Sequence, residues 1–404
     1  ANDQFEALKR RLGDFGLRIF RANGAIGAEE RAMLMRALEE GSWDIVLATP
    51  EFLQFHRDAF GGRSAPALLV IDEVHHIYES SHRAAYQRLS ETIAALGSPQ
   101  VLGLTATARD EAFAHVVKDL QIDAWVIDPY VRENLRVVDA RGTKDKVGYL
   151  RRIFEDAGKA IVYCNSRSEA SKVADALRKD FRNEVMFYHA GMPSAERALV
   201  EEYFRSGALR IVVATSAFGE GIDLPDVRHV VLYHLNFAFT EFNQQAGRAG
   251  RDGKPAQIHL LFGEADRRLN EYIIDQESPT LGVLREIYRE LRGIAKNGTI
   301  RLSQSELAGV LDLEKVNART VGVALGIFED EGLLQTGIDE EGRYLRLVPV
   351  AGKVDLSKNE RFAEGEAERE DFARFCAFVL SAGAETLERI INRPIYPQGE
   401  ALLR

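Results

Sequence analysis

The chain has 404 residues, of which 46% are hydrophobic and 28% are charged, and its formal net charge is −10. At about 150 residues per domain, this length predicts about two to three domains, each with its own core. The net charge excludes a chain that is basic throughout, although an acidic molecule can still carry a local cationic groove for nucleic acid. Its two cysteines exclude a disulfide framework and a four-cysteine zinc module, so we expect a cytoplasmic protein.

Short apolar runs alternate along the chain with longer amphipathic stretches. The runs are rich in Val, Ile and Leu, which is typical of buried parallel strands. The stretches between them, such as Ala28–Glu39, Ser168–Lys179 and Ala195–Arg205, have helical periodicity. This alternation predicts an α/β fold with parallel sheets covered by helices on both faces. The predicted strands are Asp44–Ala48, Ala67–Ile71, Val101–Leu104, Ala160–Tyr163, Val185–Tyr188, Ile211–Ala214, Val230–Tyr233 and Ile258–Leu261.

The alternation breaks once near Asp128–Arg132, and we interpret this break as a linker between two α/β units, residues 1–129 and 130–264. After Glu264 the pattern changes to three helices and a β-hairpin, which together predict a winged-helix domain over residues 265–350. The last segment, residues 351–404, is predicted to be a tail that is charged up to Asp371 and helical over Phe372–Ile391. The predicted elements of the winged helix are Leu281–Ala295, Ser303–Val310, Val316–Gly332 and the hairpin Leu333–Val348.

An acidic motif, Asp72-Glu73-Val74-His75, directly follows the predicted strand Ala67–Ile71. Ligands of open parallel sheets bind beyond the carboxyl ends of the strands. An Asp at this place can hold Mg²⁺ on nucleotide phosphates, and the adjacent Glu can act as a general base on water. The same four residues are also compatible with a solvated acidic turn.

A second motif, Thr105-Ala106-Thr107, closes the predicted strand Val101–Leu104. Small hydroxyl residues there can couple the acidic pair to a neighbouring domain, although such residues are more often helix N-caps.

Two further motifs follow in the second unit. Residues 213–223 form a strand end and a loop in which Gly219 and Gly221 permit close backbone approach to a phosphate. The same segment is also compatible with a purely structural turn. Residues 244–253 carry Arg248 and Arg251 on one face of a helix. Guanidinium forks suit phosphate oxygens and can act as arginine fingers, which makes a plain basic surface turn the weaker interpretation.

In this order, the motifs resemble those of superfamily-two helicases, and the RecQ group most of all. The resemblance extends over residues 1 to about 264. It includes Thr49-Pro50-Glu51-Phe52-Leu53, which is similar to a DNA-contacting motif, and Tyr163-Cys164-Asn165-Ser166-Arg167. It implies two RecA-like lobes, ATP and Mg²⁺ bound between them, single-stranded or duplex DNA as partner, and 3′→5′ polarity.

The resemblance also implies roles for individual residues. Asp72, through the Mg²⁺ of the nucleotide, and Glu73 serve hydrolysis, whereas His75 and Thr105, Ala106 and Thr107 couple it to DNA. The nucleotide site is completed from the second lobe. The residues for that task are Arg248, Arg251, Gln244, Gly219, Gly221 and Asp223, and those expected to contact DNA are Thr49, Pro50, Asn165, Ser166, Arg167, Thr215 and Ser216.

The sequence departs from this family in one respect that decides the chemistry. No G-x-x-x-x-G-K-[ST] phosphate loop occurs in the 404 residues, and such a loop supplies the Lys and hydroxyl that hold nucleotide and metal. We expect the chain to start after that loop, with the first lobe truncated at its N-terminus. The alternative is a helicase-like module without ATPase activity.

The predicted winged helix is weakly suited to DNA. Residues 281–350 contain nine Lys and Arg against eleven Asp and Glu, and phosphate neutralisation drives affinity for DNA. DNA contact and protein docking therefore both stay open for this domain, and repair proteins are possible partners of the winged helix or the tail. We expect an ATP-dependent DNA helicase core for repair or recombination. The alternative is a non-catalytic nucleic-acid-binding or scaffolding module of a repair protein.

Overall fold

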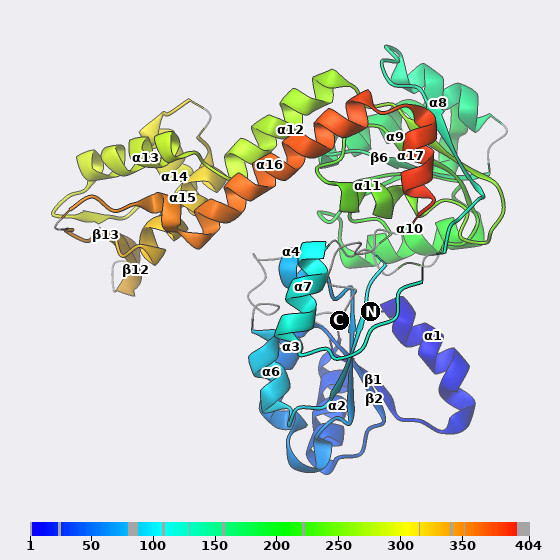
Figure 1. Ribbon diagram of the computed structural model, residues 1–404, viewed down its shortest axis with the longest axis horizontal. Helices are drawn as coiled ribbons and strands as arrows, with labels where there is room; N and C mark the ends of the chain where they lie inside the picture. The colour runs from blue at the N-terminus through cyan, green and yellow to red at the C-terminus, as the bar shows by residue number, and fades with distance from the viewer. Residues whose placement is uncertain are drawn as a thin grey trace.

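The computed structural model describes residues 2–22, 26–79, 88–106, 110–128, 130–155, 158–219, 222, 224–314, 316–339, 342–350 and 352–393. Figure 1 shows a lower α/β unit, an upper α/β unit and a helical domain that projects to one side. Within the described residues, no helix is both long and apolar enough to cross a membrane.

The upper unit is built on a parallel sheet of six strands in the order β5-β10-β9-β6-β8-β7. Apolar clusters cover both of its faces, and the side chains of the central strands are almost fully buried. This confirms the predicted α/β class. The strands are β5 (Leu135–Asp139), β6 (Lys159–Tyr163), β7 (Val185–Tyr188), β8 (Ile211–Ala214), β9 (Val227–Leu232) and β10 (Ala256–Leu260), and the helices are α8 (Lys146–Phe154), α9 (Arg167–Phe181), α10 (Ser194–Ser206) and α11 (Phe239–Ala246).

The lower unit contains two separate pairs of parallel strands. One pair is β1 (Ile19–Ala22) with β2 (Ile45–Ala48), and the other is β3 (Leu68–Asp72) with β4 (Gln100–Leu104). One face of the second pair leaves apolar side chains about half exposed: Leu68, Val70, Leu102 and Leu104. The helices are α1 (Asn2–Leu12), α2 (Ala28–Glu40), α3 (Pro50–Phe55), α4 (His76–Glu79), α6 (Leu89–Ala95) and α7 (Asp110–Asp119).

The projecting domain combines three helices with a small antiparallel sheet around one apolar core. Ser303 and Glu306 form a capping box at the start of the second helix, which satisfies backbone donors at its first turn. The elements are α13 (Leu281–Ile294), β11 (Thr299–Ile300), α14 (Gln304–Leu311), α15 (Ala318–Asp330), β12 (Leu334–Asp339) and β13 (Gly342–Leu347).

The C-terminal segment returns to the upper unit. Helix α16 (Glu360–Ser381) runs beside α12 (Glu264–Glu277), and α17 (Ala384–Ile391) packs against the edge strand β5 (Figure 1). Helix α16 already begins in the charged stretch, so the predicted start at Phe372 was wrong: its charged residues lie on a mostly exposed face while its aromatic residues are buried. Short 3-10 helices complete the fold: η1 (Gly13–Phe15), η2 (Arg57–Phe60), η3 (Gly62–Ser64), η4 (Arg182–Glu184) and η5 (Leu356–Lys358).

Candidate nucleotide and nucleic-acid site

The acidic motif lies at the carboxyl ends of β3 and β4. Asp72 is the last residue of β3 and is exposed. Its Oδ1 accepts a hydrogen bond from the Glu73 N–H (3.0 Å), and its Oδ2 accepts one from Gln4 Nε2 (2.6 Å). Glu73 has a positive φ of 51°, a conformation that non-glycine residues seldom adopt and that ends the strand sharply. The two carboxylates are thereby held at the edge of the sheet, where phosphates bind in parallel α/β folds.

His75 joins the acidic turn to the neighbouring strand. Its ring is buried, and Nδ1 lies 2.7 Å from Thr105 Oγ1 and 3.4 Å from Glu73 Oε2. Burial lowers the pKa of His75 to about 4, so the imidazole is neutral at pH 7. The structure therefore brings Asp72, Glu73, His75 and Thr105 together at the carboxyl ends of β3 and β4, with a hydrogen bond between His75 and Thr105. Ala106 follows Thr105 on the chain, and Thr107 lies outside the described residues.

The arginine motif lies at the end of α11 in the upper unit. Arg248 donates from Nη1 to the carbonyl oxygen of Ile222 (3.3 Å), and Arg251 is exposed with Nε 3.5 Å from the Gly247 carbonyl oxygen. Gly219 permits this packing, because a Cβ there would lie only 2.9 Å from Arg248 Nε and its φ of 111° excludes most side chains. Gln244 is half buried on α11, whereas Gly221 and Asp223 lie outside the described residues.

The residues expected to contact DNA follow the ends of three strands. Thr49 follows β2 and caps α3, with Pro50 at the first helical position and Oγ1 accepting from the Phe52 N–H (3.3 Å). Ser166 follows β6 and caps α9 by accepting from the Glu169 N–H (3.2 Å). Thr215 and Ser216 follow β8, which pairs with β6, so both loops lie at the same edge of the sheet.

Two neighbouring residues on the β6 loop differ in accessibility. The Arg167 side chain is exposed and packs over Gly191, where a Cβ would lie 2.8 Å from Nη1. The Asn165 side chain instead points into the unit: its Nδ2 donates to the Leu235 carbonyl oxygen (2.7 Å) and to Asn270 Oδ1 (2.8 Å). In this arrangement Asn165 shapes the loop, and Arg167 presents the cation.

A buried polar cluster that the sequence did not reveal connects this loop to α11 and α12. Asn270 on α12 donates to the carbonyl oxygens of Leu235 (2.7 Å) and Asn236 (3.2 Å). The Asn236 side chain donates to Gln245 Oε1 (2.8 Å), which places the cluster directly before Arg248. Burial raises the pKa of Glu241, which accepts from Gln245 Nε2 (2.9 Å). No residue spacing signals this cluster, because its members come from separate elements.

The comparisons with known proteins agree with this architecture. Two family models match the sequence, the DEAD/DEAH box helicase over residues 1–115 and the helicase conserved C-terminal domain over residues 145–253. These matches cover the two α/β units, and the chain therefore belongs to the helicases that carry both domains.

Proteins of similar sequence indicate which group of helicases this chain resembles. The probable ATP-dependent DNA helicase RecS of Bacillus subtilis is 34% identical over 308 residues, which is 74% of this chain and 61% of RecS. The ATP-dependent DNA helicase RecQ of the same organism is 32% identical over 68% of this chain and 47% of RecQ. The human ATP-dependent DNA helicase Q4 is 31% identical over 65% of this chain and 24% of its own length. The chain is thus similar in sequence to helicases of the RecQ group, and it spans about half the length of the bacterial relatives.

Solved structures share the fold at low identity. The helicase Lhr of Mycobacterium smegmatis, bound to single-stranded DNA and AMP-PNP, has a TM-score of 0.53 at 20% identity over 85% of this chain and 50% of its own. The DEAD-box helicase Mss116, bound to single-stranded RNA and UDP-BeF, has a TM-score of 0.55 at 17% identity over 77% of this chain and 65% of its own. The two α/β units accordingly have the RecA-like fold that the lobes of these helicases share.

Proposed function

We propose that this chain is the core of an ATP-dependent DNA helicase of the RecQ type that works in repair or recombination. The observation that carries the proposal is the cluster of Asp72, Glu73, His75 and Thr105 at the carboxyl ends of two paired strands. The relatives are named as ATP-dependent DNA helicases, which supports ATP and DNA as ligands. A cytoplasmic location is proposed with it.

In this proposal, the first lobe holds the hydrolytic groups. The exposed Asp72 carboxylate has the oxygen ligands that Mg²⁺ prefers, and the metal would neutralise charge on the transferred phosphoryl group. Glu73 would take a proton from the attacking water through its carboxylate. The neutral His75 ring lies between that carboxylate and Thr105, with Nδ1 2.7 Å from Thr105 Oγ1 and 3.4 Å from Glu73 Oε2, so a shift of β4 relative to β3 would change the surroundings of Glu73.

The second lobe would contribute Arg248 and Arg251 to the phosphates, together with Gln244 and the loop with Gly219, Gly221 and Asp223. Single-stranded DNA would pass the strand-end loops of both lobes, which contain Thr49 and Pro50, Asn165 to Arg167, and Thr215 and Ser216. Guanidinium and hydroxyl groups at such loops bind the phosphate backbone without reading sequence. Closure and reopening of the lobes would then step along the strand.

We propose that the chain is divided into two lobes, residues 1–129 and 130–264, a third domain, residues 265–350, and a C-terminal tail, residues 351–404. We propose that residues 265–350 are a winged helix, on the support of the three helices and the β12–β13 hairpin. Its net negative charge favours neither tight DNA binding nor a specific protein partner. Repair proteins are proposed as partners of this domain or of the tail.

The test is DNA-stimulated ATP hydrolysis and duplex unwinding by the full-length protein encoded by the gene that contains this sequence. Glu73→Gln is expected to lower turnover by about 100-fold or more with nucleotide and DNA still bound, because the general base is lost. Glu91→Gln, an exposed carboxylate on α6, is the matched control and leaves turnover unchanged. Full turnover by Glu73→Gln overturns the assignment, and unwinding of RNA in place of matched DNA duplexes overturns the substrate.

A further inference from the structure

The guanidinium of Arg132 contacts the backbone of the loop that carries Arg248 and Arg251, which we call the arginine loop (residues 247–254). It donates to the carbonyl oxygens of Gly247 (3.1 Å), Ala249 and Gly250 (2.8 Å). Helix α11 ends at Ala246, directly before these residues. Carbonyl groups just beyond the C-terminus of a helix lie near the negative end of its dipole, which favours a nearby cation.

Asn134 adds a second contact from the same segment. Its Nδ2 donates to the carbonyl oxygens of Gly250 (2.7 Å) and Lys254 (2.8 Å). Gly250 has a φ of 52°, and a Cβ there would lie 2.5 Å from Asn134 Nδ2. The arginine loop and the segment 132–134 therefore fit each other closely and fix one conformation of the loop.

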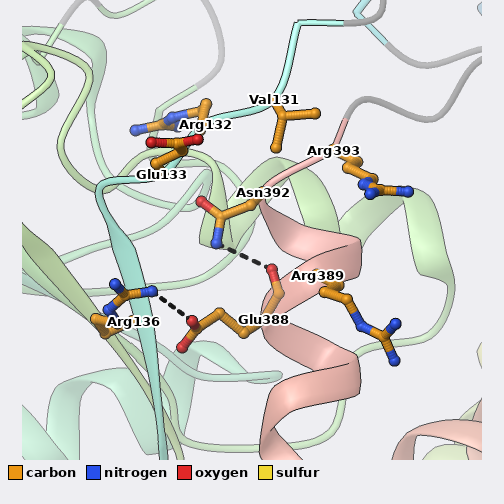
Figure 2. A pocket seen from close by; sticks show the side chains of 8 residues that line it. All are labelled: Val131, Arg132, Glu133, Arg136, Glu388, Arg389, Asn392 and Arg393. Atoms are coloured by element: carbon orange, nitrogen blue, oxygen red, sulfur yellow. Dashed lines mark hydrogen bonds and ion pairs between the residues drawn. The ribbon is translucent and has the colours of Figure 1, made fainter.

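The backbone that carries Arg132 is in turn held by residues at the end of the C-terminal helix. Figure 2 shows the neighbouring contact between Arg136 and Glu388. The Arg132 N–H donates to the carbonyl oxygen of Asn392 (2.7 Å), and Asn392 Nδ2 donates to the carbonyl oxygen of Leu135 (3.0 Å). One turn earlier, Glu388 accepts from the Val137 N–H (2.9 Å) and from Arg136 Nη1 (2.7 Å). Helix α17 thus covers the open edge of β5 and fixes the segment that enters the second lobe.

We propose that Arg132 is a positioning residue that sets the arginine loop for the nucleotide, and that α17 holds Arg132 in place. Arg132 lies where the chain enters the second lobe. A change in the course of the chain between the lobes would therefore move Arg132 and, through it, the loop that carries Arg248 and Arg251. Nothing in the residue pattern marks Arg132, since its partners are all main-chain atoms. The role of Arg132 in nucleotide binding rests on the proposed function, whereas the contact between Arg132 and the arginine loop does not.

Hydrogen–deuterium exchange of the 404-residue chain, read by mass spectrometry, tests the proposal. In Arg132→Ala, amide exchange in peptides covering residues 247–254 is expected to rise by about tenfold or more, because hydrogen bonds to a charged donor are lost there. Arg132→Lys keeps the charge but not the fork, so exchange is expected to lie between that of the wild type and that of the alanine variant. Arg389→Ala removes an exposed arginine that points away from Arg132 in Figure 2 and leaves the exchange of residues 247–254 unchanged.

Two outcomes overturn the positioning role: exchange of residues 247–254 that stays at the wild-type rate in Arg132→Ala, or exchange that rises equally in β6, β8 and β9. Binding of single-stranded DNA by the wild type is measured in parallel and addresses the proposed function separately. A chain that binds no strand contradicts the proposed function and with it the nucleotide role of the loop. Strand binding with unchanged loop exchange overturns the positioning role alone.

Discussion

Replacement of Asn270 by alanine tests the buried polar cluster behind the β6 loop. Asn270 is fully buried on α12, and its side chain makes three hydrogen bonds. Two of them go to the carbonyl oxygens of Leu235 and Asn236, and the third is accepted from Asn165 Nδ2. The substitution removes all three, while Leu235 keeps its bond from Asn165 (2.7 Å).

The magnitude follows from the groups that lose a partner. The Asn236 carbonyl oxygen loses its bond from Asn270, and the Asn165 amide loses one of its two bonds. A buried polar group without its partner costs about 1–3 kcal/mol. We therefore expect the free energy of unfolding to fall by about 2–4 kcal/mol. For a cooperative unit of about 150–250 residues this lowers Tm by about 4–16 °C.

Urea unfolding followed by circular dichroism measures this change. Leu269→Ala, at the adjacent and partly exposed position on α12, is the matched control and is expected to lower stability by less than about 1 kcal/mol. Affinity for single-stranded DNA should fall in Asn270→Ala, because Asn165 loses one of the two hydrogen bonds that anchor the loop presenting Arg167. A change in the free energy of unfolding of less than about 0.5 kcal/mol would show that the hydrogen bonds of Asn270 add no net stability.

Three further predictions concern other parts of the molecule. The 404-residue chain is expected to hydrolyse ATP negligibly with or without single-stranded DNA, because it contains no phosphate loop; robust steady-state turnover contradicts this. Burial lowers the pKa of His259 to about 3. The stability that depends on a neutral His259 is therefore complete above about pH 6.5 and is lost as pH falls toward 3; a Tm independent of pH over that range would argue against this dependence. Glu388→Ala is expected to lower the free energy of unfolding by about 1–3 kcal/mol, because the Val137 N–H loses its acceptor; the exposed Glu385→Ala is the control, and equal effects of the two would sink the argument.

The second lobe could be predicted in most of its strands because its core strands are continuous apolar runs. Runs such as Ile211–Ala214 are buried on both faces, and burial selects Val and Ile at every position. Strand β5 (Leu135–Asp139) escaped prediction because it lies at the edge of the sheet and carries the exposed Arg136. Strand β1 was missed for a related reason, since it is short and only half buried.

The candidate site could be predicted only where the reacting groups lie within one short motif of the sequence. Asp72, Glu73 and His75 are close in sequence, and the end of a strand was enough to place them together. The contact of His75 with Thr105 depends on the pairing of β3 with β4, which no motif predicted. In the structure His75 Nδ1 lies 2.7 Å from Thr105 Oγ1. The partners of Arg132 could not be predicted, because backbone carbonyl oxygens leave no signal in side-chain identity.

The central claim is that the strand-end loops of both lobes form one path for single-stranded DNA, and photo-cross-linking of a single-stranded oligonucleotide tests it most directly. The cross-linked peptides are identified by mass spectrometry. Cross-links are expected in peptides that contain Thr49 and Pro50, Asn165 to Arg167, and Thr215 and Ser216, and weaker cross-links are expected in the Arg167→Ala variant. Cross-links confined to residues 281–350, or none in either lobe, would contradict this claim.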